Sequence, residues 1–266
     1  MMNMIRADLY FLTRGKGIYI TLGIVLVLNL LILFVLAPTM EPDSNINING
    51  VAIPYMGSVI DGVTSIPLLY MTISQVNIFL MVFVLLAVAP IFVNGTVKNE
   101  LAWGMSRTKL YLSKLAVSFG LCVIMIVFYM ISGFLLATIR NGFGGPAPAG
   151  LWLTMFQTLG AQLWMLFALT SILVFLVFLT KREGIVIVAF IFGAIVPQLL
   201  LFSLDNLGIS IPNWLLYYDV VSGINRLGFL ELLDTRSIIM ILGAGSIYLL
   251  VTTIGGILWF RKGSIK

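Results

Sequence analysis

The sequence contains no histidine and a single cysteine, Cys122, and these shortages exclude several kinds of chemistry. Without histidine there is no Ser-His-Asp triad and no H-E-x-x-H zinc motif. One cysteine cannot form a disulfide within the chain, and without histidine it cannot complete a Cys/His metal site. Because Cys122 lies in the middle of an apolar run, we interpret it as a small packing residue.

Charged residues are also scarce, at 9% of the 266 residues, whereas 61% are hydrophobic. Soluble domains have about 25% charged residues, so a water-soluble fold is excluded. The net charge of +5 raises the question of nucleic-acid binding. The Lys and Arg residues, however, form short clusters between apolar runs instead of a continuous basic face. We therefore expect no nucleic-acid partner and interpret the clusters as topology signals.

What the sequence has in abundance is apolar segments long enough to cross the bilayer, which takes about 20 residues in a helix. The segments indicate an all-α integral membrane protein, with residues 1–266 forming a single transmembrane domain. The first segment is longer than the apolar core of a cleavable signal peptide, so we expect it to remain as a helix. The six predicted transmembrane helices cover residues 18–36, 68–92, 115–138, 151–179, 185–204 and 238–260.

Positive charge is distributed unevenly between the predicted connections. Twelve of the fifteen Lys and Arg residues fall on one side of the six spans, and only Arg140, Arg226 and Arg236 fall on the other. The positive-inside rule places the first set in the cytoplasm. Because six is an even number, both termini are predicted to be cytoplasmic.

Four connections have a recognisable character. Residues 1–16 can form an amphipathic interfacial helix with Ile5, Leu9 and Leu12 on one stripe, or they are simply a charged flank of the first span. We expect residues 37–67 to form an irregular external loop. Residues 205–237 are external yet hydrophobic, which favours interfacial anchoring or a re-entrant helical pair over exposure to water.

The cytoplasmic connection at residues 93–114 is a candidate docking surface. Gly104 and Ser106 mark a break between two short helices, with Ser106 capping the second. A nucleotide would need its own motif, but the only Gly-Lys pair, Gly15-Lys16, lacks the remaining residues of a P-loop. We therefore expect this chain to bind no ATP through that motif.

Uncharged polar residues inside the predicted spans are the other functional candidates. An amide in hydrocarbon needs a hydrogen-bond partner, so hydrogen bonding between helices is the default role, as expected also for Gln162. The alternative is that such residues line a substrate path. The candidates for that path are Asn29, Gln75, Asn77 and Gln198.

The residues NGTVKNEL at 94–101 and GMSRTK at 104–109, followed by Ser113-Lys114, resemble permeases of type-2 ATP-binding-cassette exporters. The resemblance is closest to the permeases of bacitracin and lantibiotic self-protection systems. Over the rest of the chain it depends on architecture: a surface helix, six spans, and a hydrophobic external segment before the last span. By position, the resemblance implies a coupling helix whose contact or hinge residues are Thr96, Lys98, Glu100, Gly104, Ser106 and Arg107.

The resemblance also implies partners and a location. Two copies of a separate ABC ATPase subunit would bind ATP and Mg²⁺, and this chain would hold no cofactor of its own. A second permease subunit, either identical or a sister protein, would complete the complex in a bacterial cytoplasmic membrane. The implied substrate is an amphipathic peptide, such as a bacteriocin or a peptide antibiotic, moved outward from the bilayer.

Two other functions are compatible with the sequence. A secondary carrier is one, although such carriers usually place ionisable residues at the membrane midplane, where this chain has none. The other is a membrane immunity or scaffold protein that sequesters its target without transporting it. Histidine is missing and no carboxylate pair lies inside the predicted spans, so we do not expect an enzyme.

Overall fold

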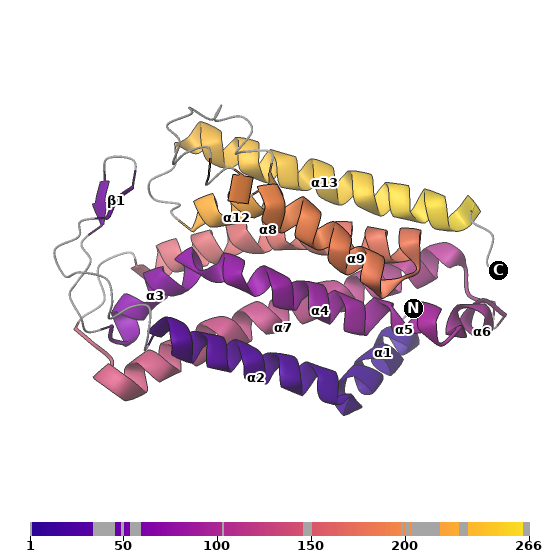
Figure 1. Ribbon diagram of the computed structural model, residues 1–266, viewed down its shortest axis with the longest axis horizontal. Helices are drawn as coiled ribbons and strands as arrows, with labels where there is room; N and C mark the ends of the chain where they lie inside the picture. Colours follow the sequence, from indigo (N-terminus) through magenta and orange to yellow (C-terminus); the bar gives the residue numbers. More distant parts are fainter. Residues whose placement is uncertain are drawn as a thin grey trace.

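The computed structural model is an elongated bundle of helices that run mostly along its long axis (Figure 1). The structure describes residues 2–33, 46–48, 51–53, 60–102, 104–145, 151–197, 199–200, 203, 219–228 and 234–262. The N-terminal helix, α6 and the last turns of α13 lie at one end of the bundle, and the β1 strand lies at the other. We call the first of these the basic end, because the predicted cytoplasmic clusters of Lys and Arg lie there.

Three helices are each long and apolar enough to cross a membrane: α7 (Arg107–Asn141), α8 (Leu151–Thr180) and α13 (Thr235–Lys262). Two bent pairs of helices raise the number of candidate spans to five if each pair counts as one. The chain is therefore a helical, membrane-embedded protein with three to five candidate spans among the described residues. The predicted total of six and the predicted sidedness remain expectations.

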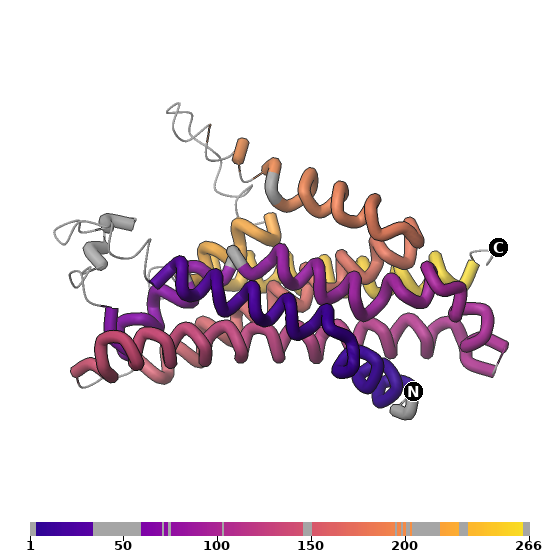
Figure 2. The backbone as a smooth tube through the Cα atoms, turned by 60° about the horizontal axis from the view of Figure 1, so that its bottom comes forward, coloured from indigo at the N-terminus to yellow at the C-terminus, as the bar shows by residue number. Residues whose placement is uncertain are grey.

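The first bent pair joins α1 (Met2–Arg14) to α2 (Lys16–Leu31) at an angle of 64°. Figure 2 shows α1 turning away from the line of α2. The predicted stripe on α1 is wrong in one respect, since Ile5 and Leu12 pack against the protein whereas Leu9 is exposed. Phe11 is more exposed still, at 74%. The reason is that Asp8 lies on the packed face, where it forms an ion pair described below.

The predicted external loop at 37–67 and the predicted second span at 68–92 both need correction. The loop region contains an antiparallel hairpin, β1 (Ile46–Ile48) with β2 (Val51–Ile53), and the start of α3 (Gly62–Met71). Asp61 starts α3 early because its carboxylate accepts from Thr64 N while Thr64 Oγ1 accepts from Asp61 N. The second span is not continuous, since α3 ends at Met71 and the 3-10 helix η3 (Ile73–Val76) separates it from α4 (Asn77–Val88).

After α4 the chain forms the short helices α5 (Pro90–Val93) and α6 (Thr96–Ala102). Residues Asn77–Val93 and α6 meet at 75°, which makes the second bent pair. The predicted break around Gly104 is present. The helix that follows the break, however, is not short as predicted, because it is the start of the 35-residue α7. Ser106 is its N-cap, as predicted, and its hydroxyl accepts from Lys109 N at 3.3 Å.

The predicted fifth span is only partly described, as α9 (Glu183–Phe190) followed by the π-helical turn η4 (Ile191–Ile195). In Figure 2, α9 lies on the outside of the bundle. Of the hydrophobic segment at 205–237, α12 (Val220–Leu227) is described, with most of its residues buried and Ile224 and Leu227 fully so. It packs against α8, α13 and η3. This part of the segment is therefore buried in protein.

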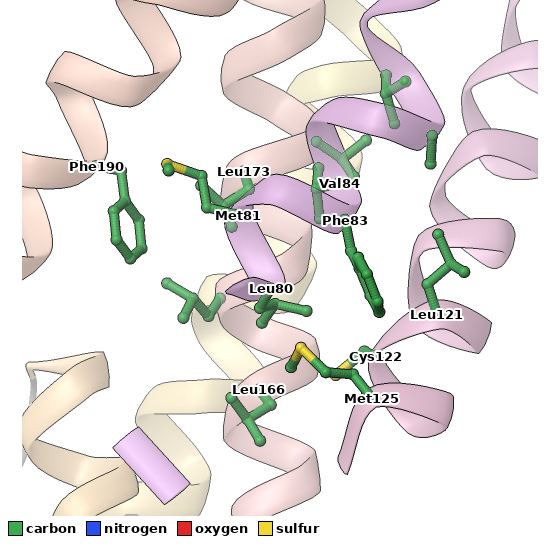
Figure 3. Close-up of a cluster of buried hydrophobic side chains, with 14 of the residues drawn as sticks. Leu80, Met81, Phe83, Val84, Leu121, Cys122, Met125, Leu166, Leu173 and Phe190 are labelled. Atoms are coloured by element: carbon green, nitrogen blue, oxygen red, sulfur yellow. The ribbon is translucent and has the colours of Figure 1, made fainter. Parts of the chain in front are cut away.

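The core surrounds α4. Figure 3 shows Leu80, Phe83 and Val84 of α4 facing Leu121, Cys122 and Met125 of α7, with Leu166 and Leu173 of α8 close by. Cys122 is fully buried and free, which confirms its predicted packing role. Helix α4 packs on α2, α7 and α8, and the break at residues 72–76 and the 75° turn into α6 lie on either side of it.

Candidate functional site

The candidate site is α6 with the turns on either side of it. Gly95 and Gly104 bracket the helix, and both have left-handed backbone angles, with φ of +66° and +81°. Residues with a Cβ rarely adopt such angles, so these turns require glycine. The family resemblance implies that Gly104 is a contact or hinge residue, and that role remains a prediction.

The two faces of α6 differ. Val97 is buried against the bundle, whereas Lys98 and Asn99 are exposed. Thr96 is half-buried, and its hydroxyl lies 3.5 Å from the carbonyl oxygen of Ile91 in α5. The helix therefore presents a small polar surface with one positive charge, at the basic end of the bundle (Figure 1).

Arg107 connects this site to the end of the last helix. Its guanidinium donates to the carbonyl oxygens of Phe260, at 3.1 Å, and Arg261, at 3.0 Å. It also lies 6.0 Å from the centre of the Phe260 ring. A cation at the C-terminus of a helix interacts favourably with the helix dipole and binds carbonyls that have no partner within the helix. Arg107 thus links the first turn of α7 to the last turn of α13.

Glu100 faces inward and belongs to a buried charged cluster that the sequence did not reveal. Lys114 of α7 is buried, and its Nζ donates to Asp8 Oδ1 of α1 at 2.7 Å. Glu100 Oε2 is buried and has no hydrogen-bond partner among the described residues. Burial raises the pKa of the Glu100 carboxyl, the Lys114 charge lowers it, and the Asp8 charge raises it. We call Asp8, Glu100 and Lys114 the charged cluster.

Some sequence signals for the charged cluster did exist. Asp8 is the one acid in residues 1–16, and it falls beside the apolar stripe of α1. Lys114 directly precedes the apolar run of the third span. Each pattern indicates a charge near a packed surface, but neither identifies its partner, because the two residues are 106 positions apart.

Among the described residues, no hydrogen bond joins one substrate-path candidate to another. Asn29 is fully buried and donates to the carbonyl oxygen of Tyr129 at 3.0 Å and to Ser132 Oγ at 2.7 Å, both on α7. Asn77 is buried at the start of α4, and in the part of the chain that the structure describes its amide oxygen and nitrogen have no partners. Gln75 lies in η3, and Gln198 lies outside the described residues.

Interhelical hydrogen bonding, the default role, is seen for two of the amides whose side chains the structure describes. Besides Asn29, Gln162 of α8 is fully buried and donates to the carbonyl oxygens of Tyr70, at 2.8 Å, and Ile224, at 3.3 Å. These bonds join α8 to α3 and α12. A further bond of 2.7 Å joins the hydroxyls of Thr72 and Tyr129, next to the break before α4.

The arrangement at the basic end can support contact and movement. Lys98 and Asn99 are exposed, and glycines bracket the helix that carries them. Arg107 binds the end of α13, and Glu100 belongs to the charged cluster. Within the described residues no three His, Cys, Asp or Glu residues are close enough to hold a metal ion.

No family model, curated protein or solved structure matches this chain.

Proposed function

We propose that this chain is the membrane-spanning subunit of an ATP-driven exporter of the type-2 ATP-binding-cassette class. The observation that carries the proposal is α6, a short polar-faced helix set at 75° to the preceding helix and bracketed by two left-handed glycines. It is a compact surface on which a separate ATPase subunit can dock. Two ATPase subunits, each binding ATP and Mg²⁺, would serve a pair of permeases, identical or sister proteins.

Force applied to α6 has two direct routes into the bundle. One route is the short turn from Gly104 to Ser106, whose hydroxyl caps α7. The other is Arg107, which holds the end of α13 through two hydrogen bonds. When ATP draws the ATPases together, α7 and α13 would move as rigid bodies around the buried core. In this scheme Thr96 and Lys98 are contact residues, and Gly104 is a hinge.

The proposed substrate is an amphipathic peptide that leaves the bilayer outward. A substrate of this kind combines apolar side chains with a polar backbone, and the latter needs hydrogen-bond partners inside the protein. Asn77 is buried, and neither of its amide atoms has a partner among the residues described, so it can donate and accept beside the break before α4. The substrate class comes from the family resemblance, and Asn77 is the described residue that suits it best.

The test is purification of the chain with an ATPase encoded beside it, followed by measurement of ATPase activity in lipid nanodiscs. Lys98→Glu reverses the exposed charge on α6 and should weaken both co-purification and peptide-stimulated ATP hydrolysis. Lys181→Glu is the matched control, because Lys181 is also exposed at the basic end but lies between α8 and α9. If no ATPase co-purifies, or if both variants behave alike, the proposal is wrong.

The same preparations separate the two alternative functions. A secondary carrier would transport peptide in proteoliposomes without ATP and would respond to an imposed ion gradient. An immunity or scaffold protein would protect cells with the ATPase deleted and with Lys98→Glu in place. An exporter should lose both transport and protection in each of those situations.

A further inference from the structure

Three charged side chains from three different helices meet inside the basic end of the bundle. They are Asp8 of α1, Glu100 of α6 and Lys114 of α7, which form the charged cluster defined above. The Lys114 side chain is 3% exposed and that of Asp8 is 14% exposed, so water screens the ion pair only weakly. Helices α4 and α5 also contact this region, and their sequences contain no charged residue.

The cluster contains two carboxylates and one ammonium group. In this structure Lys114 pairs with Asp8 at 2.7 Å, and within the described part of the chain Glu100 forms no ion pair. Asp8 Oδ2 and Glu100 Oε2 are both buried, and neither has a hydrogen-bond partner within the described ranges. Burying a carboxylate without a partner costs free energy, so pairing with Lys114 would stabilise either acid, and the two acids compete for the same cation.

The ammonium group is suited to such an exchange. Lysine has a flexible stem and three donors without a fixed plane, so its Nζ can change partners with small torsional changes. Each of the two acids lies on a helix that meets its neighbour in the chain at a bend. Helix α1 meets α2 at a 64° bend next to Gly15, and α6 lies between Gly95 and Gly104.

We propose that Lys114 is an exchangeable counter-ion that holds either α1, through Asp8, or α6, through Glu100, against α7. The present structure is the state in which Asp8 is bound. Movement of α6 toward α7 transfers the ammonium to Glu100 and releases α1 from the bundle. Its use in transport rests on the proposed function, because an ATPase on α6 would then control the position of α1, whereas the exchange itself is a property of this chain alone.

The experiment measures distances between spin labels in the purified full chain without any ATPase. In a Cys122→Ala background, one label pair joins Ala7→Cys on α1 to Ile124→Cys on α7, and the other joins Asn99→Cys on α6 to Ile124→Cys. All three positions are exposed. Asp8→Asn should broaden the α1–α7 distance distribution and narrow the α6–α7 distribution. Glu100→Gln should have the opposite effect on both.

A fixed ion pair gives a different result. Asp8→Asn would then broaden only the α1–α7 distribution, and Glu100→Gln would leave that distribution unchanged, which would overturn the exchange. Glu183→Gln, an exposed acid at the basic end, is the matched control and should change neither distribution. If Asp8→Asn fails to fold, Glu100→Gln still decides the question, because it removes no hydrogen bond or ion pair present in the structure.

The outcome is independent of the outcome for the exporter. If the exchange is observed but no ATPase associates, the counter-ion proposal is supported and the exporter proposal is contradicted. If the chain stimulates an ATPase but the ion pair is fixed, the exporter proposal is supported and the counter-ion proposal is contradicted.

Discussion

Some charged residues at the basic end have surroundings and contacts that differ from those expected from the sequence. Lys98 is exposed and available to a partner, whereas Glu100, two positions later, turns its carboxylate into the bundle. Arg107 was expected among the contact residues, and the structure places its guanidinium on two carbonyl oxygens of α13. A contact role for Arg107 remains a prediction, and a structural role is observed.

The stability of the protein should depend on pH through Glu100. Burial raises the pKa of this carboxyl in the folded state, against the lowering effect of Lys114, so the charged form destabilises the fold. The penalty is fully present above the raised pKa and decreases as pH falls toward the ordinary carboxyl value. Wild type should therefore gain thermal stability relative to Glu100→Gln as pH falls through that window. Equal pH profiles for the two proteins would contradict this explanation.

Removing the Arg107 guanidinium should free the end of α13. Arg107→Ala eliminates two charged hydrogen bonds and the favourable interaction with the helix dipole, which together are worth about 1 kcal/mol at a half-exposed site. We expect faster hydrogen exchange at residues 258–262 and a lower melting temperature in detergent. Arg107→Lys keeps the charge but loses the paired geometry, so it should fall between wild type and Arg107→Ala. Unchanged exchange in the alanine variant would show that α13 is held by packing alone.

At the scale of the elements, α7 is fastened to its neighbours by an arginine near each end. Arg107 binds the end of α13, and Arg140 donates to the carbonyl oxygen of Leu33, at the far end of α2, at 3.1 Å. The central part of α7 accepts the amide of Asn29 and packs on α4. The longest described helix therefore contacts α1, α2 and α13, and it begins at the turn that follows α6.

The turn between α6 and α7 should tolerate only glycine. Gly104→Ala places a Cβ on a backbone with φ of +81°, which costs about 1–2 kcal/mol although nothing lies within 4 Å of that Cβ. Gly120→Ala is the matched control, because it lies within α7, also has open space, and should stabilise the helix by up to about 1 kcal/mol. Thermal unfolding of both variants checks the difference. Equal effects would mean that backbone strain does not govern position 104.

At the scale of the whole molecule, the ends of the bundle differ in charge. The basic end holds the predicted cytoplasmic clusters, and the opposite end holds the hairpin β1–β2 (Figure 1). The structure thus gathers in one region the cations that the sequence separates by span-length segments. This arrangement agrees with the predicted topology, and the side of the membrane on which each end lies is still to be measured.

Cysteine labelling in intact cells measures the side of the membrane on which each end of the bundle lies. In a Cys122→Ala background, Lys181→Cys and Lys262→Cys should react with a membrane-impermeant maleimide only after the cells are opened. Gly145→Cys, at the opposite end, should react in intact cells. All three positions are exposed. Labelling of position 181 from outside would reverse the orientation and would leave α6 on the wrong side for a cytoplasmic ATPase.

The sequence by itself determined the features that depend on local composition. Apolar length specified α7, α8 and α13 as membrane helices, and glycine at 104 followed by serine at 106 specified the turn and cap before α7. These predictions succeed because transfer into lipid, backbone strain and capping are properties of a few neighbouring residues.

Only the tertiary structure decided the rest. The break before α4 occurs where the Thr72 hydroxyl meets Tyr129 of α7, and the packed face of α1 is the one where Asp8 meets Lys114. Arg107 finds carbonyl partners more than 150 residues away. Each of these features depends on a group from a distant segment that packing brings within reach, and the identity of that group is not encoded in the local pattern.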